Sequence, residues 1–464
     1  MPRESLPSAH GADADGTALR VSRSGTTSTD VAGPWTPTRA LGRAVLLIGV
    51  LVLAAVLLGR ADLVALAAPL ALGVAWALRE RPSQVPRLEL AVPADPVAEG
   101  GEVAVGLRVG NPNYEAMDLV VVRVQHSQWV PLREGDRPLV LGPSPRRITQ
   151  VARPGTALRW GQHEIGPGMA FGVACDGLLI SSQAVAPAAS LRVHPLMPPF
   201  RADSAMPRAT ALVGTHRSRR AGEGGELAGV RRYGPGDRLR RVDWRVTLRT
   251  GELHVAHTLS DRDASVVVLL DVLYEAGRSG GVHGMASVVD TTVRASAAIT
   301  EYYLRQGDRV GLLEYSGHPR HLRAAGGRRQ LQTAMEWLLR TRATAGSDDP
   351  PVFDLDPHLI PDSALVVVLT PLLGSQSADM IATLARAGRV VVAVDTLGAL
   401  ADRTVAGSQW TVLARRLWHL ERENTIGALQ EIGVPVTAWV GAGSLDQVLR
   451  DMTIMATAPR IGVR

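Results

Sequence analysis

Apolar and polar positions divide the chain into regions of different periodicity, and the first region contains two long apolar runs. The runs are Ala44–Gly59 and Leu63–Leu78, of 16 residues each, and three residues separate them. Such runs are slightly short for a bilayer, but arginines at their ends can snorkel and extend them. We therefore expect a transmembrane helical hairpin over residues 41–80, rather than a buried helix pair of a soluble domain. Residues 1–40 are rich in Ser, Thr, Gly and Pro and predict a disordered tail.

Residues 86–198 follow a strand-like pattern. Short apolar stretches such as Glu102–Val109 and Leu119–Gln125 are separated by turn-forming segments such as Gly110–Asn113. Several short strands with turns at intervals of roughly 8–12 residues are typical of a β-sandwich. Because we find no catalytic cluster in this region, we expect it to have a structural or docking role.

Strand-like and helix-like stretches alternate over residues 263–460. The expected strands are Ser265–Leu270, Arg309–Tyr315, Ala364–Thr370, Arg389–Asp395 and Val434–Trp439. The expected helices are Ser287–Gln306, Gly327–Arg340, Ala378–Ala387, Trp410–Ile432 and Leu445–Met455. This alternation predicts an α/β fold with a doubly wound parallel sheet, in which ligands bind beyond the carboxyl ends of the strands.

One of these helices carries an apolar stripe. Within Trp410–Ile432, large apolar residues recur near helical spacing, at Trp410, Leu413, Leu417, Leu420 and Ile426. A stripe of this kind is more often the buried face of a core helix than a groove for a partner. We therefore expect these side chains to belong to the core.

Composition excludes several kinds of chemistry. Apolar residues make up 46% of the 464 residues and charged residues 20%, which are values of a globular protein. All 50 basic residues are arginine, so a P-loop and a lysine Schiff base are both excluded. Cys175 is the single cysteine, which excludes an intramolecular disulfide and a cysteine-rich zinc site.

Arginines near the apolar runs predict how the hairpin is oriented. The turn between the runs has only Arg60, beside Asp62, whereas both outer flanks carry several arginines: Arg39, Arg43, Arg79, Arg81 and Arg87. Positive residues favour the cytoplasmic side of a membrane. We expect a two-pass protein of a bacterial cell membrane, with the N-terminus and the C-terminal domains in the cytoplasm.

Residues 199–262 contain the most strongly charged part of the chain. Between residues 217 and 252 lie ten arginines and five acidic residues, an excess of five positive charges. An ion-pair network joining two domains would explain this pattern. A surface for an acidic partner protein or for anionic lipid would explain it as well. We do not expect nucleic-acid binding, because only Tyr233 and Trp244 could stack on bases and no nucleic-acid motif surrounds them.

The same segment carries a motif that resembles the domain-of-unknown-function 58 family. The family pattern is roughly G-E-F followed by R-x-Y-x-x-G-D-x-x-R-x-I-x-W-x-x-x-A-R. The matching residues, which are the candidates for partner binding or for a domain joint, are Glu226, Arg231, Tyr233, Gly236, Asp237, Arg240, Asp243, Trp244 and Arg249. The sequence departs from the pattern at Leu227, Val242 and Leu248.

The α/β region resembles the von Willebrand factor A fold. The metal site of that fold uses D-x-S-x-S after the first strand, a Thr from a later loop and an Asp after a central strand, which are oxygen ligands that suit Mg²⁺. Here Asp271 matches the first acid, but Leu273 and Glu275 stand at the two serines and Pro371 follows Thr370. We therefore expect no metal and no cofactor. Asp271 is the weak candidate ligand, and a turn-capping carboxylate is its more ordinary role.

The two resemblances together imply a function. Proteins of this kind accompany MoxR-type AAA+ ATPases, so the resemblance implies a non-enzymatic, membrane-anchored adaptor or assembly factor that works with such an ATPase. We expect no catalytic residues. The alternatives are a metal-dependent hydrolase or other enzyme that uses Asp271 and Glu275, and a metal-dependent protein-binding receptor.

Overall fold

The computed structural model describes residues 35–135, 137–196, 221–234, 242–259, 265–344, 355–362, 364–400 and 409–439. The chain divides into two compact units, residues 1–193 and residues 194–464. Most of the expected N-terminal tail and the expected helix Leu445–Met455 lie outside the described residues.

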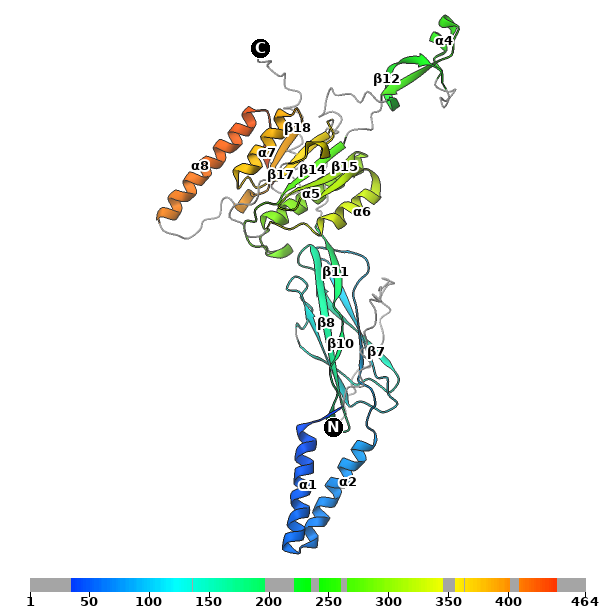
Figure 1. Ribbon diagram of the computed structural model, residues 1–464, viewed down its shortest axis with the longest axis vertical. Coiled ribbons are helices and arrows are strands. Elements are labelled where there is room, and N and C mark those ends of the chain that lie inside the picture. The colour runs from blue at the N-terminus through cyan, green and yellow to red at the C-terminus, as the bar shows by residue number, and fades with distance from the viewer. Residues whose placement is uncertain are drawn as a thin grey trace, which may run out of the picture. The chain divides into compact units, whose positions relative to one another are not determined.

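Two long apolar helices occupy the place of the expected hairpin. Helix α1 spans Arg39–Leu58 and α2 spans Ala61–Arg79, so each is long enough to cross a bilayer. Gly59 ends α1 in the left-handed conformation that glycine adopts without strain, and Arg60 pairs with Asp62 at 2.6 Å in the turn. Most of their large apolar side chains are exposed. The two helices, drawn in blue in Figure 1, are compatible with a two-pass membrane protein.

The helical pair continues into a domain of antiparallel strands. A three-stranded sheet has the order β2 (Arg87–Ala91), β4 (Glu102–Gly110), β7 (Ile148–Thr156). A larger sheet is built around the 14-residue strand β8 (Gly161–Ala174), which pairs with β5, β9, β10 and β11. These neighbours span Leu119–His126, Leu179–Ile180, Ala184–Ala186 and Ala189–His194.

Both sheets contribute to one hydrophobic core. Leu107 of β4 and Ile165 of β8 are fully buried members of it, and strand alternation places them on the inner faces. The buried Trp35, just before the short strand β1 (Thr36–Pro37), belongs to the same core, and β1 pairs with β9. Leu41 of α1 and Leu78 of α2 also pack against it. The membrane-compatible helices are therefore attached to this domain at both of their outer ends.

One described part of the second unit is a small hairpin with a helix in its loop (Figure 1). Strand β12 (Ala221–Arg232) pairs antiparallel with β13 (His254–Leu259), and helix α4 (Trp244–Thr250) lies between them in the sequence. This hairpin contains the part of the arginine-rich segment that the structure describes.

The remaining described residues form a mixed α/β domain around a six-stranded sheet (Figure 1). Four parallel strands match the expected ranges closely and a fifth is shorter: β14 (Ser265–Asp271), β15 (Arg309–Tyr315), β17 (Ala364–Thr370), β18 (Val390–Asp395) and β19 (Val436–Ala438). The sequence pattern missed β16 (His321–Ala325), which pairs antiparallel with β15 at the edge. Its half-exposed side chains lack the apolar run that marks the buried strands.

Helices cover both faces of this sheet. All seven residues of β14 are buried, as expected for a parallel strand enclosed on two sides. Helices α5 (Val288–Gln306) and α6 (Gly327–Leu338) contact each other and strand β15. Helix α7 (Ser375–Arg386) packs its apolar residues against alternate residues of β14, β17 and β18. A capping box of Ser287 and Asp290 starts α5 where the sequence predicts.

One expectation about the core is wrong. Of the five apolar residues expected to bury helix α8 (Gln409–Glu431), only Ile426 packs against the core. Trp410, Leu413, Leu417 and Leu420 are exposed. Residues on another side of α8, namely Arg422 and Leu429, are the buried ones. The choice of face depends on long-range packing that periodicity does not specify.

Candidate functional site

The carboxyl ends of the parallel strands are the place where a sheet of this order usually binds ligands. In chain order the strands run 3-2-1-4-5-6 across the sheet, so the direction of winding reverses between β14 and β17. Asp271 is the last residue of β14 and Thr370 the last residue of β17. The sequence-predicted residues Asp271 and Thr370 therefore meet at the switch point of the sheet.

These two side chains bond to each other and are sealed from solvent. The Thr370 hydroxyl donates to Asp271 Oδ2 at 2.6 Å, and the Leu273 amide donates to Oδ1 at 3.3 Å. Asp271 is 0% exposed. Burial raises the pKa of the Asp271 carboxyl above its ordinary value, and the hydrogen bonds to it oppose that rise. The geometry is that of a turn-capping carboxylate.

A buried arginine supplies positive charge beside this pair. Arg422 of α8 is 7% exposed, and its Nη2 lies 2.6 Å from Asp395 Oδ2 at the end of β18. Its Nη1 donates to the carbonyl oxygens of Pro371 at 2.5 Å and Leu372 at 3.1 Å. Leu372 has a positive φ of 48°, which is costly for a residue with a Cβ. The guanidinium thus holds a strained loop in place while its own charge is neutralised by Asp395.

We call Asp271, Thr370, Asp395 and Arg422 the strand-end cluster. The sequence pattern did not identify Arg422 or the role of Asp395. The one available signal was that Asp395 ends an expected strand, since the arginine lies 27 positions further along the chain.

The residues present do not fit the magnesium site of the von Willebrand A fold. Leu273, at the position of the first serine, is apolar and buried. Glu275, at the second, accepts a hydrogen bond from the Val289 amide at 3.2 Å through its Oε1. Within the described ranges, no three His, Cys, Asp or Glu side chains lie close enough together to hold a metal ion. The carbonyl oxygens after Thr370 are turned toward a guanidinium instead.

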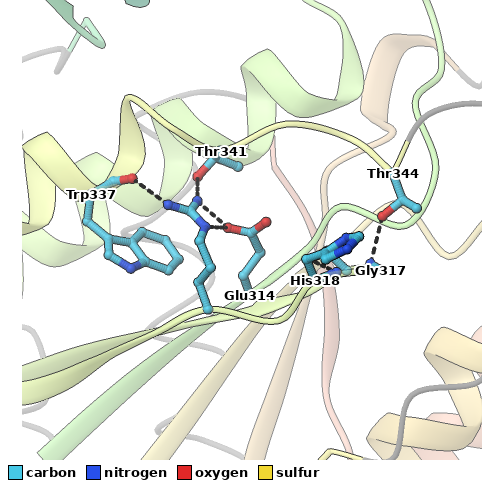
Figure 2. Close-up of polar contacts among 8 residues, drawn as sticks. Glu314, Gly317, His318, Trp337, Thr341 and Thr344 are labelled. Carbon is cyan, nitrogen blue, oxygen red and sulfur yellow. Dashed lines mark hydrogen bonds and ion pairs between the residues drawn. The ribbon is translucent and has the colours of Figure 1, made fainter.

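A second polar cluster closes the end of β15 (Figure 2). Arg320 Nε donates to Glu314 Oε2 at 2.9 Å, and the two guanidinium Nη atoms reach the Trp337 carbonyl and the Thr341 hydroxyl. The guanidinium also lies over the Trp337 ring, 4.3 Å from its centroid. Burial raises the pKa of Glu314, and the Arg320 charge acts against that rise.

The segment that follows α6 then crosses the strand ends. The Gly317 amide donates to Thr344 Oγ1 at 2.8 Å, a contact visible in Figure 2, and the Thr344 amide donates to the Val272 carbonyl at 3.0 Å. This segment therefore links the ends of β14 and β15. Together with the Glu314–Arg320 pair, these hydrogen bonds give the ends of β14 and β15 a structural role.

The described part of the arginine-rich motif is largely exposed, unlike the two buried polar clusters of the α/β domain. Asp243 caps helix α4, its Oδ1 accepting from the amides of Arg245 and Val246 at 3.1 Å each. The Asp243 amide donates to the His254 carbonyl, and the Tyr233 amide donates to the Leu253 carbonyl. These bonds fix α4 relative to the two strands.

Helix α4 exposes its large side chains. Within the hairpin Trp244 is 62% exposed and Leu248 is 83% exposed, one helical turn apart. Arg245 and Arg249 are exposed as well. We call these four residues the α4 surface. Leu248 is one of the departures from the family pattern, and it enlarges the apolar part of this surface.

The structure places the other motif residues as follows. Glu226 and Arg231 lie on strand β12, and Tyr233 follows it. Gly236, Asp237 and Arg240 lie outside the described residues. The structure therefore brings Tyr233, Asp243, Trp244 and Arg249 into one hairpin. Asp271 belongs to a different element, strand β14 of the six-stranded sheet.

Comparison with a family model matches residues 229–402, which include the motif from Arg231 to Arg249 and the first two-thirds of the α/β domain. Uncharacterized proteins of Mycobacterium bovis and of two Mycobacterium tuberculosis strains are each 36% identical to this chain over 133 residues. The matched segment is 29% of this chain and spans 40% of the length of each relative. A domain of the family described as "Protein of unknown function DUF58" is found at residues 229–402.

Proposed function

We propose that this protein is a non-enzymatic, membrane-anchored adaptor that docks a partner protein through the α4 surface. The observation that carries the proposal is the exposed Trp244–Leu248 pair, flanked by Arg245 and Arg249 on a capped helix. Tryptophan and arginine are the residues that most often dominate binding free energy at protein interfaces. A fixed helix also loses less conformational freedom on binding than a loop would.

The partner that best fits the family resemblance is a MoxR-type AAA+ ATPase. Positive charge on the α4 surface calls for an acidic patch on that partner, since opposite charges steer the encounter. In this proposal the adaptor holds the ATPase, or its client protein, at the membrane. The alternative role of the motif, as a joint between domains, predicts that α4 packs on another part of this same chain.

The two apolar helices supply the membrane anchor of the proposal. Arginines lie at both outer ends of the helical pair, whereas the turn has Arg60 neutralised by Asp62. This distribution favours a cytoplasmic location for the N-terminus and for the later domains. An ATPase of the cytoplasm would then have access to the α4 surface.

The α/β domain is proposed to be a von Willebrand A-like scaffold without a magnesium site. In the strand-end cluster Asp395 pairs with Arg422 and Asp271 accepts from Thr370, so these side chains bond to one another. An enzyme built on Asp271 and Glu275 would need both carboxylates to reach a substrate or metal. Asp271 is sealed from solvent and Glu275 is bonded to the start of α5, so neither geometry favours that alternative.

A pull-down of the tagged full-length protein from mild detergent, with and without ATP, tests the proposal by mass spectrometry. We expect recovery of an AAA+ ATPase that depends on nucleotide and that falls at least about tenfold in the double variant Trp244→Ala/Leu248→Ala. Ile148→Ala, which removes a similarly exposed apolar side chain from β7, is the matched control and leaves recovery unchanged. If the double variant still recovers the ATPase but melts at a lower temperature, the motif is a joint between domains and the docking proposal is wrong.

A further inference from the structure

Helix α8 presents an apolar stripe that no described residue of its unit covers. Trp410 is 71% exposed and Leu417 is 63% exposed, and Leu413 and Leu420 lie exposed beside them. Burying four large apolar side chains of one helix face against a partner removes apolar surface from water, which favours association. A stripe of this kind on a long helix marks an interaction surface.

The opposite side of α8 is firmly attached to the domain. Arg422 reaches Asp395 and the Pro371–Leu372 carbonyls, while Ile426 and Leu429 pack into the core below the sheet. Because an α-helix has about 3.6 residues per turn, Arg422, Ile426 and Leu429 lie on a different side of α8 from Leu417 and Leu420. The stripe is therefore held outward by the packing of the domain.

The spacing of the stripe is that of a coiled-coil seam. Trp410, Leu413, Leu417 and Leu420 follow one another at intervals of three, four and three residues, which are the a and d positions of two heptads. The next a position is Asn424, which is exposed. A single asparagine at an a position specifies register and two-stranded pairing.

The charges beside the seam match a second copy of the same helix. In this register Arg416 occupies a g position and Glu421 the following e position, and both are exposed. In a parallel two-stranded coiled coil, a g residue faces the e residue five positions later in the partner helix. Arg416 of each copy would therefore face Glu421 of the other. An anionic membrane surface is a poorer match, because it would attract Arg416 but repel Glu421 and Glu423, all of which are exposed.

We propose that α8 pairs in parallel with α8 of a second copy of this chain. Two heptads form a weak seam in isolation, but anchoring both copies in one bilayer raises their effective concentration. The pairing rests on the proposed membrane anchor, but it leaves the α4 surface uninvolved and so does not depend on the proposed docking of a partner protein.

Cysteine cross-linking of the full-length protein in detergent and in native membranes tests the pairing. The native Cys175 is buried and is replaced by Ser for this purpose. Mild oxidation of Leu417→Cys is expected to give at least about tenfold more disulfide-linked dimer than Val412→Cys, because identical a positions face each other in a parallel pair. Val412 is similarly exposed on α8 but occupies a c position, away from the seam.

Charge reversal provides the second measurement, on variants whose helix content is unchanged. Arg416→Glu and Glu421→Arg alone each place like charges together, so each is expected to lower the dimer fraction about threefold to tenfold. The double reversal is expected to restore it. The proposal is overturned by equal cross-linking in the Val412→Cys and Leu417→Cys variants, or by a double reversal no better than the singles. The proposal is also overturned if the Leu417→Cys variant is monomeric and its introduced thiol is protected from a water-soluble thiol reagent. In that case another segment of the chain, or lipid, covers the stripe.

Discussion

The strand-end cluster and the α4 surface both contain arginine, yet the arginine charge is neutralised in the first and exposed in the second. In the strand-end cluster the guanidinium of Arg422 and the carboxylate of Asp395 neutralise each other in the interior. On the α4 surface, Arg245 and Arg249 remain in water beside an exposed tryptophan. A buried charge must find a partner within the fold, whereas an exposed one remains available to another molecule. Burial, more than residue type, separates a structural cluster from a docking surface.

The largest expected effect comes from breaking the buried pair. Arg422→Ala leaves Asp395 without its counter-ion and two loop carbonyls without donors, so we expect a loss of about 3–5 kcal/mol in the α/β domain. Hydrogen exchange of the β17 and β18 amides measures this locally. Arg329→Ala, which changes an exposed arginine of helix α6 outside the α8 stripe, is the control and is expected to change protection by less than about 0.5 kcal/mol. Equal effects of the two substitutions would contradict the distinction between the clusters.

The second effect concerns pH. The folded pKa of Asp271 is raised, so the folded state binds the proton more tightly than the unfolded state does. The contribution of Asp271 to stability is therefore greatest below the ordinary carboxyl pKa and is lost as pH rises through the raised folded value. Asp271→Asn removes this dependence, so the melting temperature of the variant is expected to gain on the wild type as pH rises through that window. Parallel melting curves at all pH values would contradict it.

The helix cap of α4 should matter less to stability than the buried pair, and more to binding. Asp243→Ala removes the acceptor for two amides, and we expect it to cost about 1 kcal/mol in the hairpin. Hydrogen exchange of residues 244–250 reports the cap, and the pull-down reports the surface. Asp243→Asn, which keeps a capping oxygen, serves as the control and should retain both. Loss of the cap with no change in partner recovery would show that order in α4 is not needed for docking.

The smallest expected effect completes the contrast. Arg232 Nε lies 2.9 Å from Glu252 Oε2 in the hairpin, and both side chains are largely exposed. Such a pair contributes about 0–1 kcal/mol and less in salt. We expect Arg232→Ala to change the hydrogen exchange of β12 and β13 barely measurably at about 0.15 M salt. If Arg232→Ala lowered the stability of the hairpin as much as Arg422→Ala lowers that of the α/β domain, burial would not explain the difference between the two regions.

Local patterns located most of the α/β domain and the apolar helical pair. The runs over Ser265–Leu270 and Ala364–Thr370 correspond to β14 and β17 almost residue for residue, because a strand enclosed on both faces needs a continuous apolar run. Strand β16 was missed because a strand at the edge of the sheet is partly exposed and needs no continuous apolar run. From its place at the strand end, Asp271 was expected to cap a turn rather than to bind a metal, and the Leu273 amide donates to its Oδ1.

The sequence by itself determined the periodic elements, the apolar helical pair, the absence of lysine chemistry and the DUF58-like motif, because each depends on residues close together in the chain. Only the tertiary structure decided that Arg422 closes the strand-end cluster and that the stripe from Trp410 to Leu420 faces outward. Helix α8 has apolar residues on more than one side, and periodicity alone does not choose between them. The choice follows from the neutralisation of Asp395 and the packing of Leu429, which are contacts between residues distant in the sequence.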